Sequence, residues 1–243
     1  MQVKDLQAMG IWPDILVCRS EHPLDDGLRG KIALFCNVPK THVLQNLDVE
    51  VLYEAPLAME EEHLAEVACQ CLNLPCPEPD LTEWRAMIDA WKHPEKEVTV
   101  ALVGKYITLH DAYISVVEAL KHGGIASLSV VNIKWVDSET VTPDNVAELL
   151  GDVNGILVPG GFGSRGIEGK ITAIEYARTH NIPFLGLCLG MQLSIVEYAR
   201  HVLKYTDAHS IELDPKTTHP VIDLMPDQNG VEDIGGTLRL GSY

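Results

Sequence analysis

The 243-residue sequence predicts an α/β protein whose C-terminal part is a doubly wound, mostly parallel sheet. From residue 98 onward, short apolar runs alternate regularly with helical stretches of about a dozen residues. Several of these runs end in glycine-rich turns, and hydrophobic residues make up 46% of the chain, enough for a sizeable core. Apolar strands joined by helices lie parallel, with helices covering both faces of the sheet.

The pattern before residue 98 is less regular. Residues 14–20 are predicted as a buried strand, residues 30–38 as a short helix, and residues 48–59 as a strand leading into a turn. Residues 64–72 carry apolar side chains at helical spacing, which predicts a helix. Residues 75–97 combine a proline-rich turn, an amphipathic helix and a charged exit, as linkers often do. We expect one domain over residues 1–75, an interdomain linker over 76–97 and a second domain over 98–243.

The second domain alternates strands and helices along the chain. Strands are expected at residues 98–106, 128–137, 154–163 and 182–190, and helices at residues 112–124, 169–181 and 191–203. Ligands of such sheets bind at the carboxyl ends of the strands. Functional residues are therefore expected where these strands end.

Composition excludes several classes of protein. The formal net charge of −17 argues against a nucleic-acid partner, because polyphosphate backbones need basic patches. No apolar run approaches the length of a membrane span, and the N-terminus lacks the pattern of a signal peptide. The six cysteines are scattered among predicted helices and strands, as is typical of reduced thiols. These features predict a cytoplasmic protein without a membrane partner.

The segment NIPFLGLCLGMQ, residues 181–192, places Cys188 where a buried strand gives way to a helix. Gly186 and Gly190 bracket it in the pattern G-x-C-x-G, a nucleophile elbow with sulfur in place of a serine oxygen. The glycines permit a tight turn, and the start of the helix favours the thiolate over the thiol. The N–H of Leu189 is left free to face a developing oxyanion. A buried structural cysteine would need neither glycine, so the pattern favours a nucleophile.

A glycine-rich loop, VPGGFGSRG at residues 158–166, ends the preceding strand. Gly160 and Gly161 would let the backbone approach a ligand and direct an N–H toward the space above Cys188. Glycine loops also occur simply as flexible connections, so the loop alone is a weak signal. A sulfur nucleophile with two oxyanion donors is suited to attack on the carbonyl carbon of an amide or ester.

The motifs PGGFGSRGIEGK (159–170) and FLGLCLGMQ (184–192) resemble the class I glutamine amidotransferase domain of the CTP synthase family. The segments GIWPDILVCRS (10–20), KIALFCNV (31–38) and GKY (104–106) resemble the end of the synthetase domain and the amidotransferase start in the same family. The likeness covers nearly the whole chain. It implies that the tail of a P-loop-type α/β synthetase domain precedes an incomplete amidotransferase domain.

The resemblance also implies a reaction. In that family the cysteine attacks the carboxamide of glutamine and releases ammonia through a thioester, and a carbon–nitrogen ligase reaction that consumes ATP then aminates UTP to CTP. Glutamine, UTP and ATP are the implied substrates, CTP is product and inhibitor, and GTP is an allosteric activator. Mg²⁺ would accompany ATP on ligands outside this chain, and the full-length form would be a homotetramer.

Site residues follow from the same resemblance. Cys188 corresponds to the nucleophile, and the oxyanion and glutamine site to Gly161, Leu189, Gly190, Met191, Gln192 and Glu212. Gly161 and Leu189 would be the oxyanion donors, while Glu212 would hold the substrate's amino group, although Ile211 and Leu213 depart from the family's usual residues there. Lys31 corresponds to a contact with UTP or CTP, and the ATP site to Arg19, Leu47, Asp48 and Val49. Arg165 and Arg239 are candidates for the activator site or a lid, and no metal ligand is assigned.

Two motifs of that family are missing from this sequence. No G-x-x-x-x-G-K-[ST] loop occurs, and none of His201, His209 and His219 has an acid two residues on, as a His-x-Glu general base would require. We therefore expect an internal piece of the enzyme, cut at both ends and inactive alone. The alternatives are a binding or assembly module of the same family that catalyses nothing, or another cysteine-elbow protein of the protease-like or glyoxalase-like kind.

Overall fold

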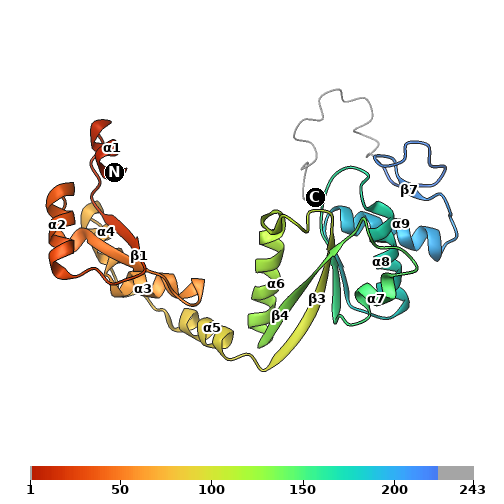
Figure 1. Cartoon of the computed structure of the whole chain (residues 1–243), viewed down its shortest axis with the longest axis horizontal. Coiled ribbons are helices and arrows are strands. Elements are labelled where there is room, and N and C mark those ends of the chain that lie inside the picture. The colour runs from red at the N-terminus through yellow and green to blue at the C-terminus, as the bar shows by residue number, and fades with distance from the viewer. Residues whose placement is uncertain (1, 224–243) are drawn as a thin grey trace. The chain divides into compact units, whose positions relative to one another are not determined.

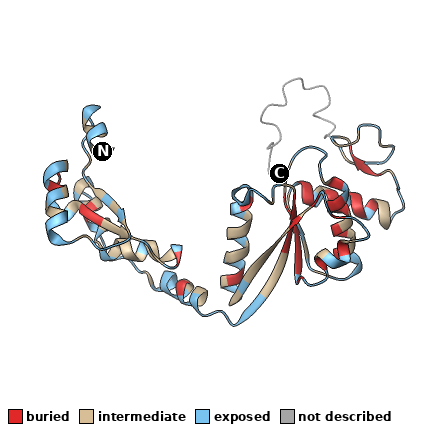
Figure 2. Cartoon of the chain, viewed as in Figure 1, coloured by how far each residue is buried: buried red, intermediate tan, exposed pale blue. Residues whose placement is uncertain are grey.

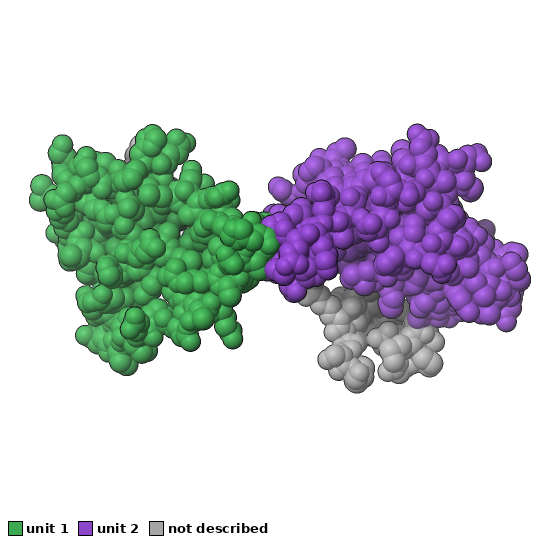
Figure 3. Space-filling model, turned by 90° about the horizontal axis from the view of Figure 1, so that it is seen from below, with its two compact units in different colours: residues 1–93 green, residues 94–243 purple. Residues whose placement is uncertain are grey.

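The protein is described from a computed structural model, which covers residues 2–223. The chain forms two compact units, Met1–His93 and Pro94–Tyr243, coloured separately in Figure 3. The first holds the predicted synthetase tail, and the second holds the cysteine elbow.

The described part of the second unit is built on a four-stranded parallel sheet (Figure 1). Its strands, in spatial order, are β4 (Ser129–Asp137), β3 (Lys96–Gly104), β5 (Gly155–Val158) and β6 (Phe184–Gly186). The chain goes from β3 to β4 on one side and then to β5 on the other. The order of strands therefore reverses between β3 and β5, which is where ligands of open α/β sheets bind.

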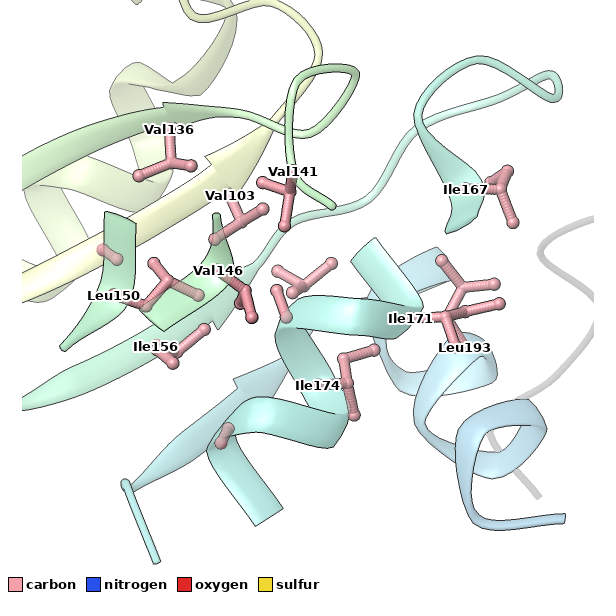
Figure 4. Packing of buried hydrophobic residues seen from close by; sticks show 14 of the residues in the cluster. Val103, Val136, Val141, Val146, Leu150, Ile156, Ile167, Ile171, Ile174 and Leu193 are labelled. Carbon is pink, nitrogen blue, oxygen red and sulfur yellow. The ribbon is translucent and has the colours of Figure 1, made fainter. Parts of the chain in front are cut away.

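Helices cover both faces of this sheet. The helix α6 (Ile114–Ala126) follows β3, while α7 (Val146–Leu150), α8 (Ile167–Thr179) and α9 (Leu189–His201) follow the later strands. Side chains along β3 alternate between the faces: Val103 packs with Ile171 and Leu193 in the core shown in Figure 4. Leu102 packs on the opposite face with Tyr113 and the partly buried side chains of α6. The predicted doubly wound fold is confirmed.

The face of the sheet that carries Val103 is more deeply buried than the face that carries Leu102. Figure 2 shows buried residues concentrated on the strands and on α8 and α9, whose apolar faces meet. Between these helices Arg178 donates to both carboxylate oxygens of the buried Glu197, at 3.0 and 2.7 Å. This pairing lets a carboxylate lie in the helix interface, since a buried charge needs a partner.

The first unit is a smaller βαβ arrangement. The strands β1 (Leu16–Ser20) and β2 (Val43–Leu47) pair in parallel and are joined through α2 (Asp26–Cys36). Arg29 of α2 forms an ion pair with Glu62, 2.7 Å between the nearest atoms, and also donates to the carbonyl of Val43. The remaining helices are α1 (Gln2–Ala8), α3 (Ala55–Glu61), α4 (Leu64–Leu72) and α5 (Thr82–Lys92), with short 3-10 turns η1 (Lys40–His42) and η2 (Leu52–Glu54).

One predicted element is wrong. Residues 48–59 do not contain a strand, since η2 and α3 occupy most of them, and the strand β2 comes just before. A proline stands in the first turn of α3, where its missing N–H costs nothing, and the carboxylate of Glu54 accepts from the N–H of Val51. The strands predicted at 14–20, 128–137, 154–163 and 182–190 are confirmed with shorter bounds, and the one at 98–106 is confirmed but begins and ends two residues earlier. The predicted helices are also confirmed: the helix at 64–72 has the predicted bounds, and the others are shifted by a few residues.

After α9 the described chain closes with a short parallel pair. It consists of β7 (His209–Ser210) and β8 (Pro220–Ile222). Earlier in the second unit, a 3-10 turn η3 (His110–Tyr113) precedes α6. Within residues 2–223, none of the helices combines the length and the apolar character that crossing a membrane requires.

Candidate functional site

Cys188 lies between the last residues of β6 and the first residue of α9, and its side chain is exposed. Its backbone angles are φ 50° and ψ −107°. The helix-capping residues Asn37 and Asn73 also have positive φ, but their ψ values of 48° and 41° place them in the ordinary left-handed region. Cys188 is outside that region, and such strained backbone clusters at functional sites. The elbow predicted from G-x-C-x-G is present.

The two glycines are required by close contacts within the turn. A Cβ on Gly186 would lie 2.5 Å from the carbonyl carbon of Gly190. A Cβ on Gly190 would lie 2.0 Å from the carbonyl oxygen of Val158 in β5. Both contacts are with backbone, which cannot move aside cheaply. The sequence pattern therefore reflects a turn pressed against the neighbouring strand.

The glycine loop after β5 lies against Cys188, while the N–H that it was predicted to direct toward the sulfur stays a prediction. A Cβ on Gly160 would lie 3.3 Å from the Cβ of Cys188 and 3.9 Å from its Sγ. The N–H of Gly190 donates to the carbonyl of Leu187 at 2.9 Å. The N–H of Leu189 belongs to the first turn of α9, whose N–H groups have no acceptor within the helix. The role of this N–H toward an oxyanion stays a prediction.

Two lysines lie against the same loop, and the sequence analysis missed both. A Cβ on Gly161 would lie 3.7 Å from Cε of Lys105 and 3.9 Å from Nζ of Lys170. The Nζ of Lys105 donates to the carbonyl of Phe162. Lys170 had a readable signal, because it occupies the apolar stripe that Ile167, Ile171 and Ile174 form along α8 (Figure 4).

The other residues assigned to the glutamine site lie in the first turn of α9 and in the turn after β7. Met191 and Gln192 follow Leu189 and Gly190 in the first turn of α9, with Met191 exposed and Gln192 half-buried. Glu212 is exposed in the turn after β7, and its N–H donates to Oγ of Ser210 at 3.3 Å. Its role toward the substrate's amino group stays a prediction.

The two candidate arginines differ in what the structure says of them. Arg165 lies in the loop before α8 and pairs with Glu139 at 3.0 Å. Arg239 lies outside the described residues. The activator or lid role stays a prediction for both.

The three histidines that follow Cys188 are engaged in contacts of their own. His201 is at the opposite end of α9, where its Nδ1 lies 3.2 Å from Glu197. His209 is buried and accepts from the N–H of Ser210, and burial followed by the charge of Arg200 lowers its pKa. His219 pairs with Asp207 at 2.5 Å, and the hydrogen bonds from Thr218, followed by this contact, lower the pKa of Asp207. These contacts give the three rings structural partners.

The nucleotide residues predicted in the first unit lie near the ends of β1 and β2. Leu47 is the last residue of β2, and the following Asp48 accepts from Arg19, the fourth residue of β1, at 3.1 Å. Lys31 is exposed on α2. The structure thus brings Arg19 and Asp48 together, while the ATP and UTP roles stay predictions.

One cluster of side chains has ligand atoms close enough together to hold a metal ion among the described residues. It consists of Glu175, Glu197 and His201, whose atoms lie within 4.8 Å of one another. Arg178 already compensates the charge of Glu197. The cluster is better explained as an ion-pair network joining α8 to α9.

Comparison with known proteins identifies the family of both units. The pattern of the family described as "Glutamine amidotransferase class-I" matches residues 108–242, and that described as "CTP synthase N-terminus" matches residues 1–74. The CTP synthase of Clostridium kluyveri is 58% identical over 241 residues, and that of Halalkalibacterium halodurans is 55% identical. In both comparisons the match spans 99% of this chain but 45% of the relative.

A solved structure shares the fold of the second unit. The glutaminase domain of Trypanosoma brucei CTPS with bound acivicin is 39% identical, with a TM-score of 0.53, over 55% of this chain and 52% of that one. The chain therefore belongs to the class I glutamine amidotransferase family, in the branch where this domain follows a CTP synthase N-terminus.

Proposed function

We propose that this chain provides the glutamine-hydrolysing site of a CTP synthase, with Cys188 as the nucleophile. The observation that carries the proposal is the strained backbone of Cys188, which holds an exposed thiol between the glycine loop and the start of α9. A structural cysteine gains nothing from such strain, whereas a nucleophile is presented by it.

The chemistry is attack on an amide. The sulfur of Cys188 bonds to the side-chain carbonyl carbon of glutamine, and the N–H groups of Leu189 and Gly161 stabilise the oxyanion. The carbon–nitrogen bond then breaks, and the nitrogen takes up a proton and leaves as ammonia. Water hydrolyses the thioester to glutamate and the free thiol. Met191, Gln192 and Glu212 would bind the rest of the substrate.

The ammonia would serve the amination of UTP to CTP in the complete protein, with ATP and Mg²⁺, under activation by GTP. Lys31 would contact the pyrimidine nucleotide, and Arg19 with Leu47, Asp48 and Val49 would lie near ATP. The chain spans 45% of the length of the relatives it matches, so the ligase reaction belongs to the longer protein. A homotetramer is the proposed assembly of that longer form.

Covalent labelling tests the proposal directly. Cys188 and Cys76 are the two exposed thiols among the described residues. Desolvation, the thiol of Cys69 and the carboxylates of Glu60 and Glu66 raise the pKa of Cys76. A limiting amount of acivicin should therefore modify Cys188, as located by peptide mass spectrometry, and the label should vanish in Cys188→Ala but persist in the matched Cys76→Ala. Label spread over Cys69, Cys71 and Cys76 would rule out an activated thiol at the elbow.

A further inference from the structure

Lys170 is completely buried, yet its charge has no partner among the described residues. Among the described residues it is the largest, by residue volume, whose side chain is fully buried. Its Nζ makes no hydrogen bond within residues 2–223. It also stands in the first turn of α8, where the helix dipole disfavours a cation. A buried polar group without a partner calls for an explanation, and catalysis is one of the recognised ones.

The surroundings of Lys170 make its charge costlier still. The Nζ of Lys170 lies close to Gly161 of the glycine loop, and Lys105 lies beside the same glycine. Burial and then the charge of Lys105 lower the pKa of Lys170 to about 8. Two cations therefore flank one short loop, and the ammonium of Lys170 loses its proton within the range of pH in which enzymes work.

The loop that Lys170 lies against also lies against Cys188. A Cβ on Gly160 would lie 3.9 Å from the sulfur of Cys188, and Gly161 is the next residue along the chain. The other charged side chains of α8, of α9 and of the loop before α8 include these pairs: Glu168 with Arg200, Arg178 with Glu197, His201 with Glu175 and Glu197, and Arg165 with Glu139. None of these ion pairs includes Lys170, whose Nζ has no hydrogen-bond partner within residues 2–223.

We propose that Lys170 is a positioning residue of the nucleophile site, whose ammonium behind Gly161 stabilises negative charge on the sulfur of Cys188 and on the oxyanion. This inference rests on the proposed function. The unpaired cation costs stability in the resting protein, and its compensating charge appears when the thiolate or the oxyanion forms. Because the low-dielectric interior screens charges weakly, the effect does not require direct contact.

Alkylation of Cys188 by iodoacetamide measures this effect. The thiolate forms a bond to the CH₂ carbon and iodide leaves, so the rate reports negative charge on sulfur without needing the glutamine pocket. At pH 7, Lys170→Met should react about tenfold more slowly than the wild-type chain, as expected for unit charges on the order of 10 Å apart. The ratio of the two rates should fall toward one above about pH 9, when Lys170 is neutral in the wild type.

Two further variants separate this role from a structural one. Lys96→Met removes a lysine at the far end of β3 and should leave the rate unchanged, which controls for net charge. In a Lys105→Met background, the pH at which Lys170→Met no longer changes the alkylation rate should rise, because Lys105 lowers the pKa of Lys170. A purely structural lysine would not make one variant's pH profile depend on the other.

Stability supplies the second measurement. Lys170→Met should unfold at the same or a higher temperature than the wild type, since an unpaired buried charge is removed. A lower unfolding temperature would show that Lys170 has an anionic partner in the folded chain and would overturn the proposal. Equal alkylation rates at pH 7 would overturn it as well, leaving the proposed function intact. A wild-type chain whose Cys188 does not react would overturn both.

Discussion

Replacing Gly190 with alanine tests whether the elbow depends on the contact between α9 and β5. The new Cβ would lie 2.0 Å from the carbonyl oxygen of Val158 and 2.9 Å from its carbonyl carbon. Both atoms belong to the backbone of a buried strand, so the helix must move by about 1 Å to restore ordinary contact. Overpacking costs about 1–3 kcal/mol, and the better helix propensity of alanine returns at most about 1 kcal/mol. We expect a net loss of about 2 kcal/mol in the free energy of unfolding.

Gly123→Ala is the matched control. Gly123 lies in α6, and a Cβ there would meet nothing within 4 Å, so alanine should stabilise the chain by about 0.5–1 kcal/mol. Urea unfolding followed by circular dichroism gives both free energies, and the iodoacetamide rate reports on Cys188. The Gly190 variant should lose reactivity and the Gly123 variant should keep it. If Gly190→Ala were as stable and as reactive as the wild type, the glycines could not be what fixes the turn.

Three other predictions concern charges. Arg178→Met should destabilise the second unit by about 3 kcal/mol in thermal unfolding, because it leaves the buried carboxylate of Glu197 without its cationic partner. Adding Glu197→Met should restore most of this loss. The ion pair with Arg29 lowers the pKa of Glu62 below its usual 4.5, so its stabilising effect is present above that pH and is lost as the pH falls, an acid sensitivity that Arg29→Met should reduce. The pKa of Lys170 is lowered from 10.5 to about 8. As the pH rises from about 8 to 10.5, the free energy of unfolding of the wild type should therefore increase by about 3 kcal/mol relative to that of Lys170→Met.

The features that the sequence predicted well are local ones. The turn at Cys188 needs glycines two residues before and two after, and both requirements are written within five residues. The buried strands of the second unit are continuous apolar runs, because helices cover both of their faces. Such signals do not depend on knowing which distant segments meet.

The features that were missed depend on distant contacts. The strand β2 contains Gln45 and Asn46 and becomes a strand by pairing with β1. Residues 52–61 contain apolar and aromatic side chains that suit a strand, yet capping and a proline in the first turn favour a helix. The position of Lys170 in the apolar stripe of α8 is readable in the sequence, but its closeness to the loop at Gly161 is not. Contacts with distant segments therefore decide β2 and the surroundings of Lys170, whereas residues 52–61 follow local signals that outweigh strand propensity.

The costly features of the second unit gather at the carboxyl end of its sheet. Cys188 has the strained backbone, Lys170 the unpaired buried charge, and Ser138, just after β4, the other buried polar atom without a partner in the described chain. The α8–α9 interface, by contrast, shows close apolar packing and paired charges. Stability that is given up beside an exposed thiol is expected of a site that is organised before its substrate arrives. Substitutions that relax this edge should therefore raise the unfolding temperature and lower the reactivity of Cys188 together.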